Sequence, residues 1–204
     1  MKLYDFARAP NPRRVRIFLA EKDIKVPTVQ VDIAKREHKK DEFRAVNPLM
    51  RLPVLELDDG TCIAESVAIC RYFEETDPEP PLFGRDPKEK ALVEMWNRRM
   101  ELNLLAHIAA AFRHTHPDFK DLEEQVPEWG EVNRRAAERQ FVWFNDVLAD
   151  RKFVAGDSYT IADITALCAT DFAKVVKLRP MEDEGLPHLR RWYQVVSSRP
   201  SAKA

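Results

Sequence analysis

The chain has 204 residues, and its 33 lysines and arginines nearly balance its 34 aspartates and glutamates. This balance indicates neither a nucleic-acid nor a membrane partner, and no apolar run approaches the ~20 residues that a membrane-spanning helix requires. The length allows one compact body or two small domains with a shared core. Residues 1–5 lack the long apolar core of a signal peptide, so we expect a cytoplasmic protein.

The first elements predicted are a strand over residues 2–6 and a helix from about Pro12 to Lys22. Asn11 is a favoured N-cap residue, and Pro12 suits the first helical position because its missing N–H costs nothing there. The apolar stripe of this helix is predicted to consist of Val15, Phe18 and Leu19. Its arginines are expected to spread toward solvent: Arg13, Arg14 and Arg16.

Two further elements are expected before residue 47. Alternation at Val29 and Val31 predicts a second strand. Residues 38–46 indicate a charged loop and a short helix that packs through Phe43.

Residues 47–73 predict a turn, a strand, a tight turn, a second strand and a helix. Asp59-Gly60 is a hairpin signal because both residues accept positive φ at low cost. Ser66 is predicted to cap the helix that follows. Leu52-Pro53 is a candidate cis peptide, since proline is tolerated as the first residue of a strand. The sequence up to residue 76 thus indicates a βαβαββα domain.

Residues 77–86 are rich in proline and are predicted to be a linker. In residues 87–204 the apolar residues recur at the spacing of an α-helix, which predicts a helical region. Asp86 is expected to cap a long helix that continues to a break near residue 116, and a second helix is expected from about Glu128 to Leu148. The inward side chains predicted for these helices include Leu92, Leu102 and Val132. We expect two domains, 1–76 and 87–204, the first α/β and the second all-α.

A later helix has a clear start signal. Thr160 is a cap residue, and Asp163 has the spacing to reach back to the backbone of the cap, which completes a capping box.

The three cysteines and the paired histidines suggest no further site. Cys62, Cys70 and Cys168 contain no C-x-x-C pair, and their apolar neighbours predict small buried side chains. His114 and His116 have the spacing of two metal ligands, but no third ligand is identifiable. No metal site is therefore predicted.

Residues 47–73 resemble the thiol-binding half of the glutathione transferase family. In that family the residue before a cis-proline pairs its backbone with glutathione, and a Glu-Ser or Gln-Ser pair holds the γ-glutamyl end. Leu52-Pro53 and Glu65-Ser66 stand in those places. Residues 154–164 resemble the family's folding motif, and residues 189–200 its C-terminal helix. The resemblance implies a thioredoxin-like domain followed by a helical bundle, and a homodimer.

The glutathione transferase resemblance also implies roles for other residues. The serine of the theta and zeta classes falls on Ala9, and the tyrosine-type classes place their tyrosine at Asp5 rather than Tyr4. The loop resembles the Thr-Pro-Asn segment of bacterial nu-type transferases, which makes Asn11 the candidate contact for the sulfur. Basic residues in theta-like relatives similarly suggest that Lys39 and Arg51 hold the glycyl carboxylate.

Two readings of the sequence remain open. The first is a glutathione-dependent enzyme that transfers the thiol to a small electrophile, a disulfide or a peroxide. The second is a non-catalytic interaction module of the same fold in a larger assembly. Glu65-Ser66 together with Leu52-Pro53 favours the enzyme. The serine expected at Ala9 is missing, and so is the cysteine that the beta class places at Pro10; these absences favour the module more weakly.

Overall fold

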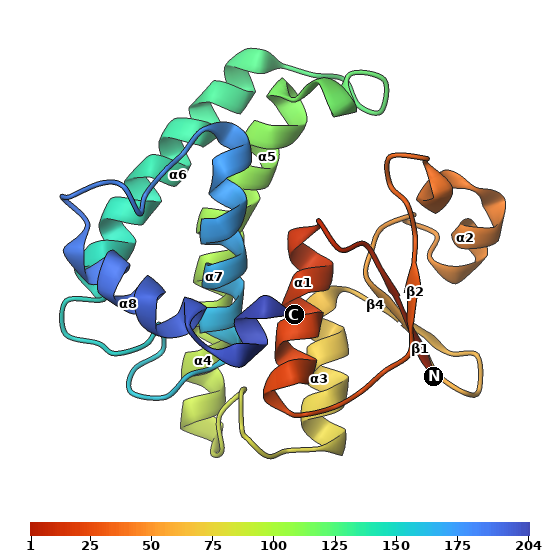
Figure 1. Ribbon diagram of the computed structural model, residues 1–204, viewed down its shortest axis with the longest axis horizontal. Coiled ribbons are helices and arrows are strands. Elements are labelled where there is room, and N and C mark those ends of the chain that lie inside the picture. Colours follow the sequence, from red (N-terminus) through yellow and green to blue (C-terminus); the bar gives the residue numbers. More distant parts are fainter. The chain divides into compact units, whose positions relative to one another are not determined.

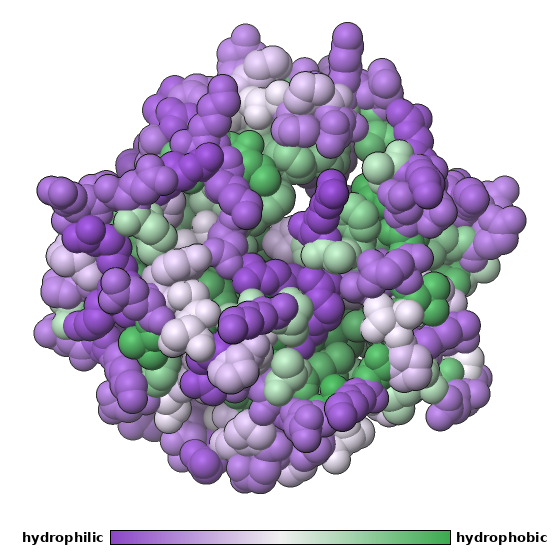
Figure 2. Space-filling model, viewed as in Figure 1, coloured by the Kyte–Doolittle hydropathy of each residue, from purple (hydrophilic) through white to green (hydrophobic).

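The computed structural model describes all 204 residues, which form two compact units. The first unit comprises residues 1–82 and 200–204 and contains the sheet, whereas residues 83–199 form a helical unit (Figure 1). The domain bounds of 1–76 and 87–204 remain predictions. Polar side chains cover most of the face seen in Figure 2, with apolar side chains in separate groups between them.

The first unit is built on a four-stranded sheet with the strand order β2-β1-β3-β4. β1 (Lys2–Asp5) runs parallel to β2 (Thr28–Gln30) and antiparallel to β3 (Val54–Glu56), which pairs with β4 (Cys62–Ala64). In the β3–β4 hairpin only Gly60 of the two predicted turn residues has positive φ, at 85°. The predicted βαβαββα order is confirmed.

Helices cover both faces of this sheet. α1 (Pro10–Glu21) and α3 (Ser66–Thr76) lie side by side against one face (Figure 1). On the other face, η1 (Glu37–Lys39) leads into α2 (Asp41–Val46). Phe43 of α2 packs with Val31 and Val54, as the sequence predicted. The alternation of side chains along β1 and β3 supplies apolar residues to both layers.

The proline-rich segment after α3 has no regular structure, but a buried lysine ties it to α1. The Lys22 ammonium is fully buried and lies 2.9 Å from a carboxylate oxygen of Glu74. It also donates to the carbonyls of Asp77 and Pro80 at 2.7 and 2.8 Å. Since every donor of the ammonium has an acceptor, the charge is compensated inside the unit.

The helical unit begins with a long stretch that includes a π-helical segment. α4 (Pro87–Arg99) continues into η2 (Met100–Leu105) and α5 (Ala106–Thr115). η3 (Pro117–Phe119) precedes α6 (Pro127–Val147), and α7 (Ile161–Phe172), η4 (Ala173–Val176) and α8 (Pro187–Ser197) follow. η5 (Pro200–Lys203) belongs to the first unit. Asp86 caps α4 as predicted, accepting the Glu89 N–H at 2.8 Å.

The buried faces of these helices differ from the prediction in part, because Trp96, Ile108 and Phe144 are buried as expected, but three other side chains are not. Leu92, Leu102 and Val132 were predicted to point inward, but they are 40%, 52% and 41% exposed. The buried stripes instead contain two asparagines, Asn97 in α4 and Asn133 in α6. Because an asparagine takes a buried position in each helix, the apolar residues alone do not mark the buried face, and the predicted stripe is displaced from it. The π segment turns the side chains of Leu102 and its neighbours further, because its hydrogen bonds span five residues.

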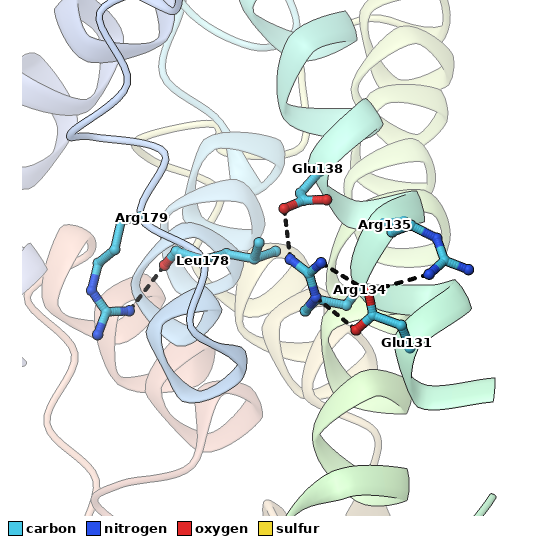
Figure 3. Close-up of polar contacts among 6 residues, drawn as sticks. All are labelled: Glu131, Arg134, Arg135, Glu138, Leu178 and Arg179. Carbon is cyan, nitrogen blue, oxygen red and sulfur yellow. Dashed lines mark hydrogen bonds and ion pairs between the residues drawn. The ribbon is translucent and has the colours of Figure 1, made fainter. Parts of the chain in front are cut away.

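The exposed side of α6 has a network of ion pairs (Figure 3). Arg134 donates twice to Glu131, at 2.8 and 2.9 Å, and once to Glu138, at 2.6 Å. Arg135 also contacts Glu131. The Arg134 guanidinium holds the pKa of the Glu131 carboxyl below its usual value. These pairs have the i,i+3 and i,i+4 spacing that stabilises a helix modestly.

The predicted capping box at the start of α7 is confirmed. The Thr160 hydroxyl accepts the Ala162 N–H, and Asp163 accepts the Thr160 N–H at 3.0 Å. The second carboxylate oxygen of Asp163 accepts from the Val154 N–H and the Trp192 indole at 2.9 and 2.8 Å. Burial raises the pKa of Asp163 to about 6, although these donors oppose the shift. One carboxylate thus joins a helix start, a loop and α8.

Two of the cysteines are buried as predicted, but Cys62 is exposed. It lies on β4, the strand at one edge of the sheet, where no further strand covers it. No group of three or more histidine, cysteine, aspartate or glutamate side chains is placed to hold a metal ion. None of the helices combines the length and apolar character needed to cross a membrane.

Candidate functional site

The start of α3 brings a buried cation to Ser66. Arg14 of α1 is 1% exposed and donates from Nη1 to the Ser66 hydroxyl at 2.8 Å. Ser66 is the first residue of α3 and itself buried, whereas Glu65, at φ 67°, is exposed. The predicted role of Ser66 as N-cap is therefore wrong, because Glu65 holds that position and no side chain caps the helix. The guanidinium and the helix N-terminus both favour an anion beside Ser66.

The prediction that Arg14 faces solvent is also wrong. Arg14 precedes the buried residues Ile17 and Phe18 by three and four positions, so it shares their face of α1. This spacing could have indicated from the sequence that Arg14 is buried. The reading of the sequence missed it because arginine is rarely buried without a partner, and the partner lies 52 residues away.

The loop before β3 is fixed by one buried asparagine. The Asn47 amide donates to the Arg51 carbonyl at 2.8 Å and accepts the Leu49 N–H at 3.1 Å. The Leu52-Pro53 peptide is cis, as predicted from the sequence. Leu52 packs against the cluster formed by Val31, Phe43 and Val54 on the α2 face of the sheet. The backbone entering β3 is thus held from both ends.

The loop between β1 and α1 is held by Asp5, which is 1% exposed. Its carboxylate accepts from Arg16 at 2.5 Å and from the Gln30 amide at 2.6 Å. Arg16 also donates to the Ala7 carbonyl at 2.9 Å, and the Gln30 oxygen accepts the Ala7 N–H. Asp5 therefore orients the loop that leads to Asn11, a role that the sequence did not indicate.

Asn11 lies in the first turn of α1 and is exposed. The predicted N-cap role is wrong, because α1 begins at Pro10 and Ala9 occupies the N-cap position without a side-chain hydrogen bond. Pro10 and Pro12 have no N–H group, and the Arg13 N–H donates to the Ala9 carbonyl at 3.2 Å. Of the first three residues of α1, only Asn11 therefore presents a backbone donor, and its side-chain amide lies on the same residue.

Of the other side chains near the proposed glutathione site, some are exposed and some are already buried or hydrogen-bonded. Lys39 at the end of η1 and Arg51 beside the cis peptide are exposed and form no ion pair. His38 is buried, and desolvation, aided by the neighbouring Lys39 charge, lowers its pKa. Tyr4 donates to Glu56 at 2.8 Å, so its hydroxyl already has an acceptor within the sheet.

Together these groups can hold a zwitterion. At the start of α3, an exposed carboxylate on Glu65 stands next to the anion-favouring surroundings of Ser66. A ligand that bears an ammonium and a carboxylate on one carbon matches this pair. Three of the predicted contacts lie where the β3–β4 hairpin meets α3: Leu52, Glu65 and Ser66. Asn11 is the second residue of α1, which lies beside α3.

Comparison with known proteins identifies the family. The N-terminal domain of glutathione S-transferases matches residues 1–75, and the C-terminal domain matches residues 105–200. Glutathione S-transferase 2 of Saccharomyces cerevisiae is 44% identical over 208 aligned residues, which cover 100% of this chain and 88% of the relative.

Solved structures agree with this assignment. The crystal structure of Gtt2 from Saccharomyces cerevisiae has a TM-score of 0.94 at 43% identity, covering 100% of this chain and 99% of that one. A glutathione S-transferase domain-containing protein from Marinobacter aquaeolei VT8 has a TM-score of 0.92 at 42% identity, covering 98% and 99%. The chain therefore has the glutathione transferase fold and belongs to the glutathione S-transferase family.

Proposed function

We propose that the first unit binds reduced glutathione by its γ-glutamyl end at Glu65 and Ser66. The observation that carries this proposal is the hydrogen bond from the buried Arg14 to Ser66. The γ-glutamyl carboxylate accepts from the Ser66 hydroxyl and the first N–H groups of α3, while the ammonium contacts Glu65. Arg14 acts through Ser66 as a positioning residue and a source of positive potential.

The rest of glutathione extends from this anchor. The backbone of Leu52 pairs with the cysteinyl part, and the exposed cations Lys39 and Arg51 receive the glycyl carboxylate. Asn47 supports this arrangement because its hydrogen bond to the Arg51 carbonyl sets the backbone beside Leu52. The sulfur then comes to the first turn of α1, where Asn11 contacts it.

Activation of the thiol at Asn11 is expected to be moderate. A free thiol has a pKa of ~8.5, and only the thiolate is nucleophilic. The first turn of α1 offers one backbone N–H and one neutral amide, both from Asn11, because the flanking prolines donate nothing. Neutral donors and a partial helix dipole stabilise a thiolate less than a full positive charge does.

This limited activation favours disulfide exchange over conjugation to sluggish electrophiles. A thiol attacks disulfide sulfur best when its pKa lies near the ambient pH, so strong activation is not required. Glutathione thiolate attacks the disulfide, one substrate thiol leaves, and a second glutathione releases the other thiol as glutathione disulfide forms. We therefore assign glutathione-dependent disulfide reductase or peroxidase activity in excess of a weak conjugating activity.

The test is turnover of a small hydroxyalkyl disulfide beside that of an activated aryl halide, each with wild type and Asn11→Ala. We expect the disulfide to be the faster substrate and both rates to fall in Asn11→Ala. Aryl conjugation faster by an order of magnitude contradicts the assigned reaction. Failure to be retained on immobilised glutathione, together with the absence of both turnovers, supports the non-catalytic interaction module instead.

The family also suggests a homodimer, which we retain as part of the proposal. Large apolar side chains remain exposed on the helical unit, among them Leu102 of η2 and Trp129 and Val132 of α6. A dimer that buries them predicts twice the monomer mass in light scattering. The cysteines are sparse and form no disulfide, which is in keeping with a reducing compartment, and the cytoplasm is the proposed location.

A further inference from the structure

Four hydrogen bonds join the end of β1, the end of β2 and α1 around a single residue of the loop between β1 and α1. One carboxylate oxygen of Asp5 accepts from Arg16, and the other accepts from the Gln30 amide. The same two side chains also contact Ala7: Arg16 donates to its carbonyl at 2.9 Å, and the Gln30 oxygen accepts its N–H at 3.2 Å. One buried carboxylate therefore holds both side chains that fix the backbone of Ala7. We call these four hydrogen bonds the Asp5 clamp.

The donors and acceptors of the Asp5 clamp have a fixed order. A carboxylate only accepts, so Gln30 must turn its NH₂ group toward Asp5, and its oxygen then faces the Ala7 N–H, which only donates. An amide in place of Asp5 leaves two donors face to face at one contact. A carboxylate in place of Gln30 leaves two acceptors face to face. Exchanging both groups restores the order of all the hydrogen bonds and keeps the net charge.

The outer part of the Asp5 clamp is not needed to satisfy a buried group. Gln30 lies on β2, an edge strand whose three residues are all exposed, and Ala7 is exposed as well. Water bonds to an exposed peptide N–H about as well as a side-chain oxygen does, so Gln30 adds little to the free energy of unfolding. What the side chain provides and water does not is a fixed position for the loop.

Hydrogen bonds continue from this loop into the first turn of α1. The Ala9 N–H donates to the Phe6 carbonyl at 3.0 Å, and the Ala9 carbonyl accepts the Arg13 N–H at 3.2 Å. Asn11 stands between two prolines, whose rings restrict φ at positions 10 and 12. Little conformational freedom therefore remains between the clamped loop and Asn11.

We propose that the Asp5 clamp sets the position of Asn11 relative to the glutathione sulfur, and thereby the rate of thiol transfer. Asp5 and Gln30 act as positioning residues, and this role rests on the proposed contact of Asn11 with the sulfur. The clamp does not hold glutathione, because the proposed anchors of the γ-glutamyl group are Glu65 and Ser66. Loss of the clamp therefore lowers kcat and leaves the dissociation constant of glutathione unchanged.

The experiment is a double-mutant cycle of Asp5→Asn and Gln30→Glu. Turnover of a small hydroxyalkyl disulfide gives kcat, and calorimetry gives the dissociation constant of glutathione. Each single variant should lower kcat about tenfold to a hundredfold, because a misplacement of about 1 Å costs this much in rate. The double variant should recover most of the rate, because it restores the order of donors and acceptors. All three variants should bind glutathione with near wild-type affinity.

The two single substitutions change the net charge in opposite directions, which separates position from electrostatics. If charge near the sulfur controlled the rate, Asp5→Asn would favour the thiolate and raise kcat, whereas Gln30→Glu would disfavour the thiolate and lower kcat. The Asp5 clamp predicts that kcat falls in both variants.

Matched controls make the same exchanges at exposed positions outside the clamp. Asp23→Asn at the end of α1 and Gln194→Glu in α8 should leave kcat unchanged. Because Asp5 is buried, Asp5→Asn is assayed only below its measured melting temperature. Gln30→Met is the second variant: it removes the exposed part of the clamp without changing the charge, and it should also lower kcat.

Three results would overturn the inference. The first is a wild-type kcat in both Gln30→Glu and Gln30→Met. The second is a change of kcat in opposite directions in the two single variants, which would assign the effect to charge. The third is a double variant no faster than the slower single variant. A wild-type protein without turnover overturns the proposed function and the clamp's role with it, whereas an active wild type with equally active Gln30 variants overturns only the role of the clamp.

Discussion

Arg14 Nη1 and Ser66 Oγ are 2.8 Å apart, which links the first turn of α3 to the buried face of α1. The guanidinium is almost completely enclosed, so its charge is screened little by water and acts strongly on nearby groups. A buried cation is costly to keep at a helix N-terminus, where the helix dipole is also positive. In the proposed complex, the γ-glutamyl carboxylate lies near both the guanidinium and the helix N-terminus, and it is attracted by each of them.

The pair predicts a specific effect on glutathione binding. Arg14→Gln should weaken binding by about tenfold to a hundredfold, because a charge-assisted interaction of ~1.5–3 kcal/mol is removed. Arg13→Gln is the matched control: Arg13 is the neighbouring arginine of α1 and donates to the Ala202 carbonyl instead. Calorimetry should show near wild-type affinity for the control. Equal affinity in both variants, with melting curves showing both folded, contradicts the role of Arg14.

The buried Lys22–Glu74 pair predicts a non-additive effect on stability. Lys22→Met should cost about 3–5 kcal/mol in the free energy of unfolding, because it strands a buried carboxylate. Lys22→Met combined with Glu74→Leu should recover part of that loss, since no uncompensated charge remains, although the Asp77 and Pro80 carbonyls still lose their donor. Urea denaturation of the two single variants and the double variant measures the coupling. Additive losses would show that the two charges do not depend on each other.

Asp163 predicts a pH dependence of stability. Its pKa is raised to about 6 in the folded protein, so between about pH 4 and pH 6 the folded state binds more protons than the unfolded state. Stability from this group is therefore present at low pH and falls as the pH rises through 6, by up to about 3 kcal/mol.

The comparison that isolates Asp163 is wild type against Asp163→Asn, with unfolding free energies measured from pH 4 to pH 7. The stability of wild type relative to the variant should decline across this range. At low pH the protonated acid still has two oxygens that face donors, whereas the amide of the variant replaces one of them with an NH2 group that only donates. The variant should therefore be the less stable protein at low pH. A stability difference that stays constant, or that grows with pH, would mean that the pKa of Asp163 is not raised.

The sequence predicted the elements well because local signals agree with the fold. The capping box of Thr160 and Asp163, the Asp86 cap and the glycine of the β3–β4 turn each work within a few residues, so they can be read from the chain alone. The cis peptide before Pro53 was predicted from its place at a strand start and from the family resemblance.

The errors occurred where a polar side chain is satisfied by a residue distant in sequence. The buried Arg14 donates a hydrogen bond to the Ser66 hydroxyl. The buried Asn97 accepts one from the Thr165 hydroxyl at 2.6 Å. Asn133 lies in the buried stripe of α6 with the His107 ring 2.8 Å from its amide oxygen. A prediction based on the spacing of apolar residues assigns such polar residues to the solvent side. The predicted buried face is therefore rotated about the helix axis away from the observed one. The start of α1 was misplaced by two residues because Asn11 has strong cap propensity while Pro10 and Pro12 both fit a first turn.

The central claim is that Glu65 holds the ammonium of the γ-glutamyl group, and a double cycle on protein and ligand tests it most directly. The cycle measures dissociation constants of wild type and Glu65→Gln for glutathione and for glutaryl-cysteinyl-glycine, which lacks only the ammonium. Glu65→Gln should weaken glutathione about tenfold to a hundredfold and leave the affinity for the glutaryl analogue nearly unchanged. Equal changes in affinity for the two ligands would contradict the account.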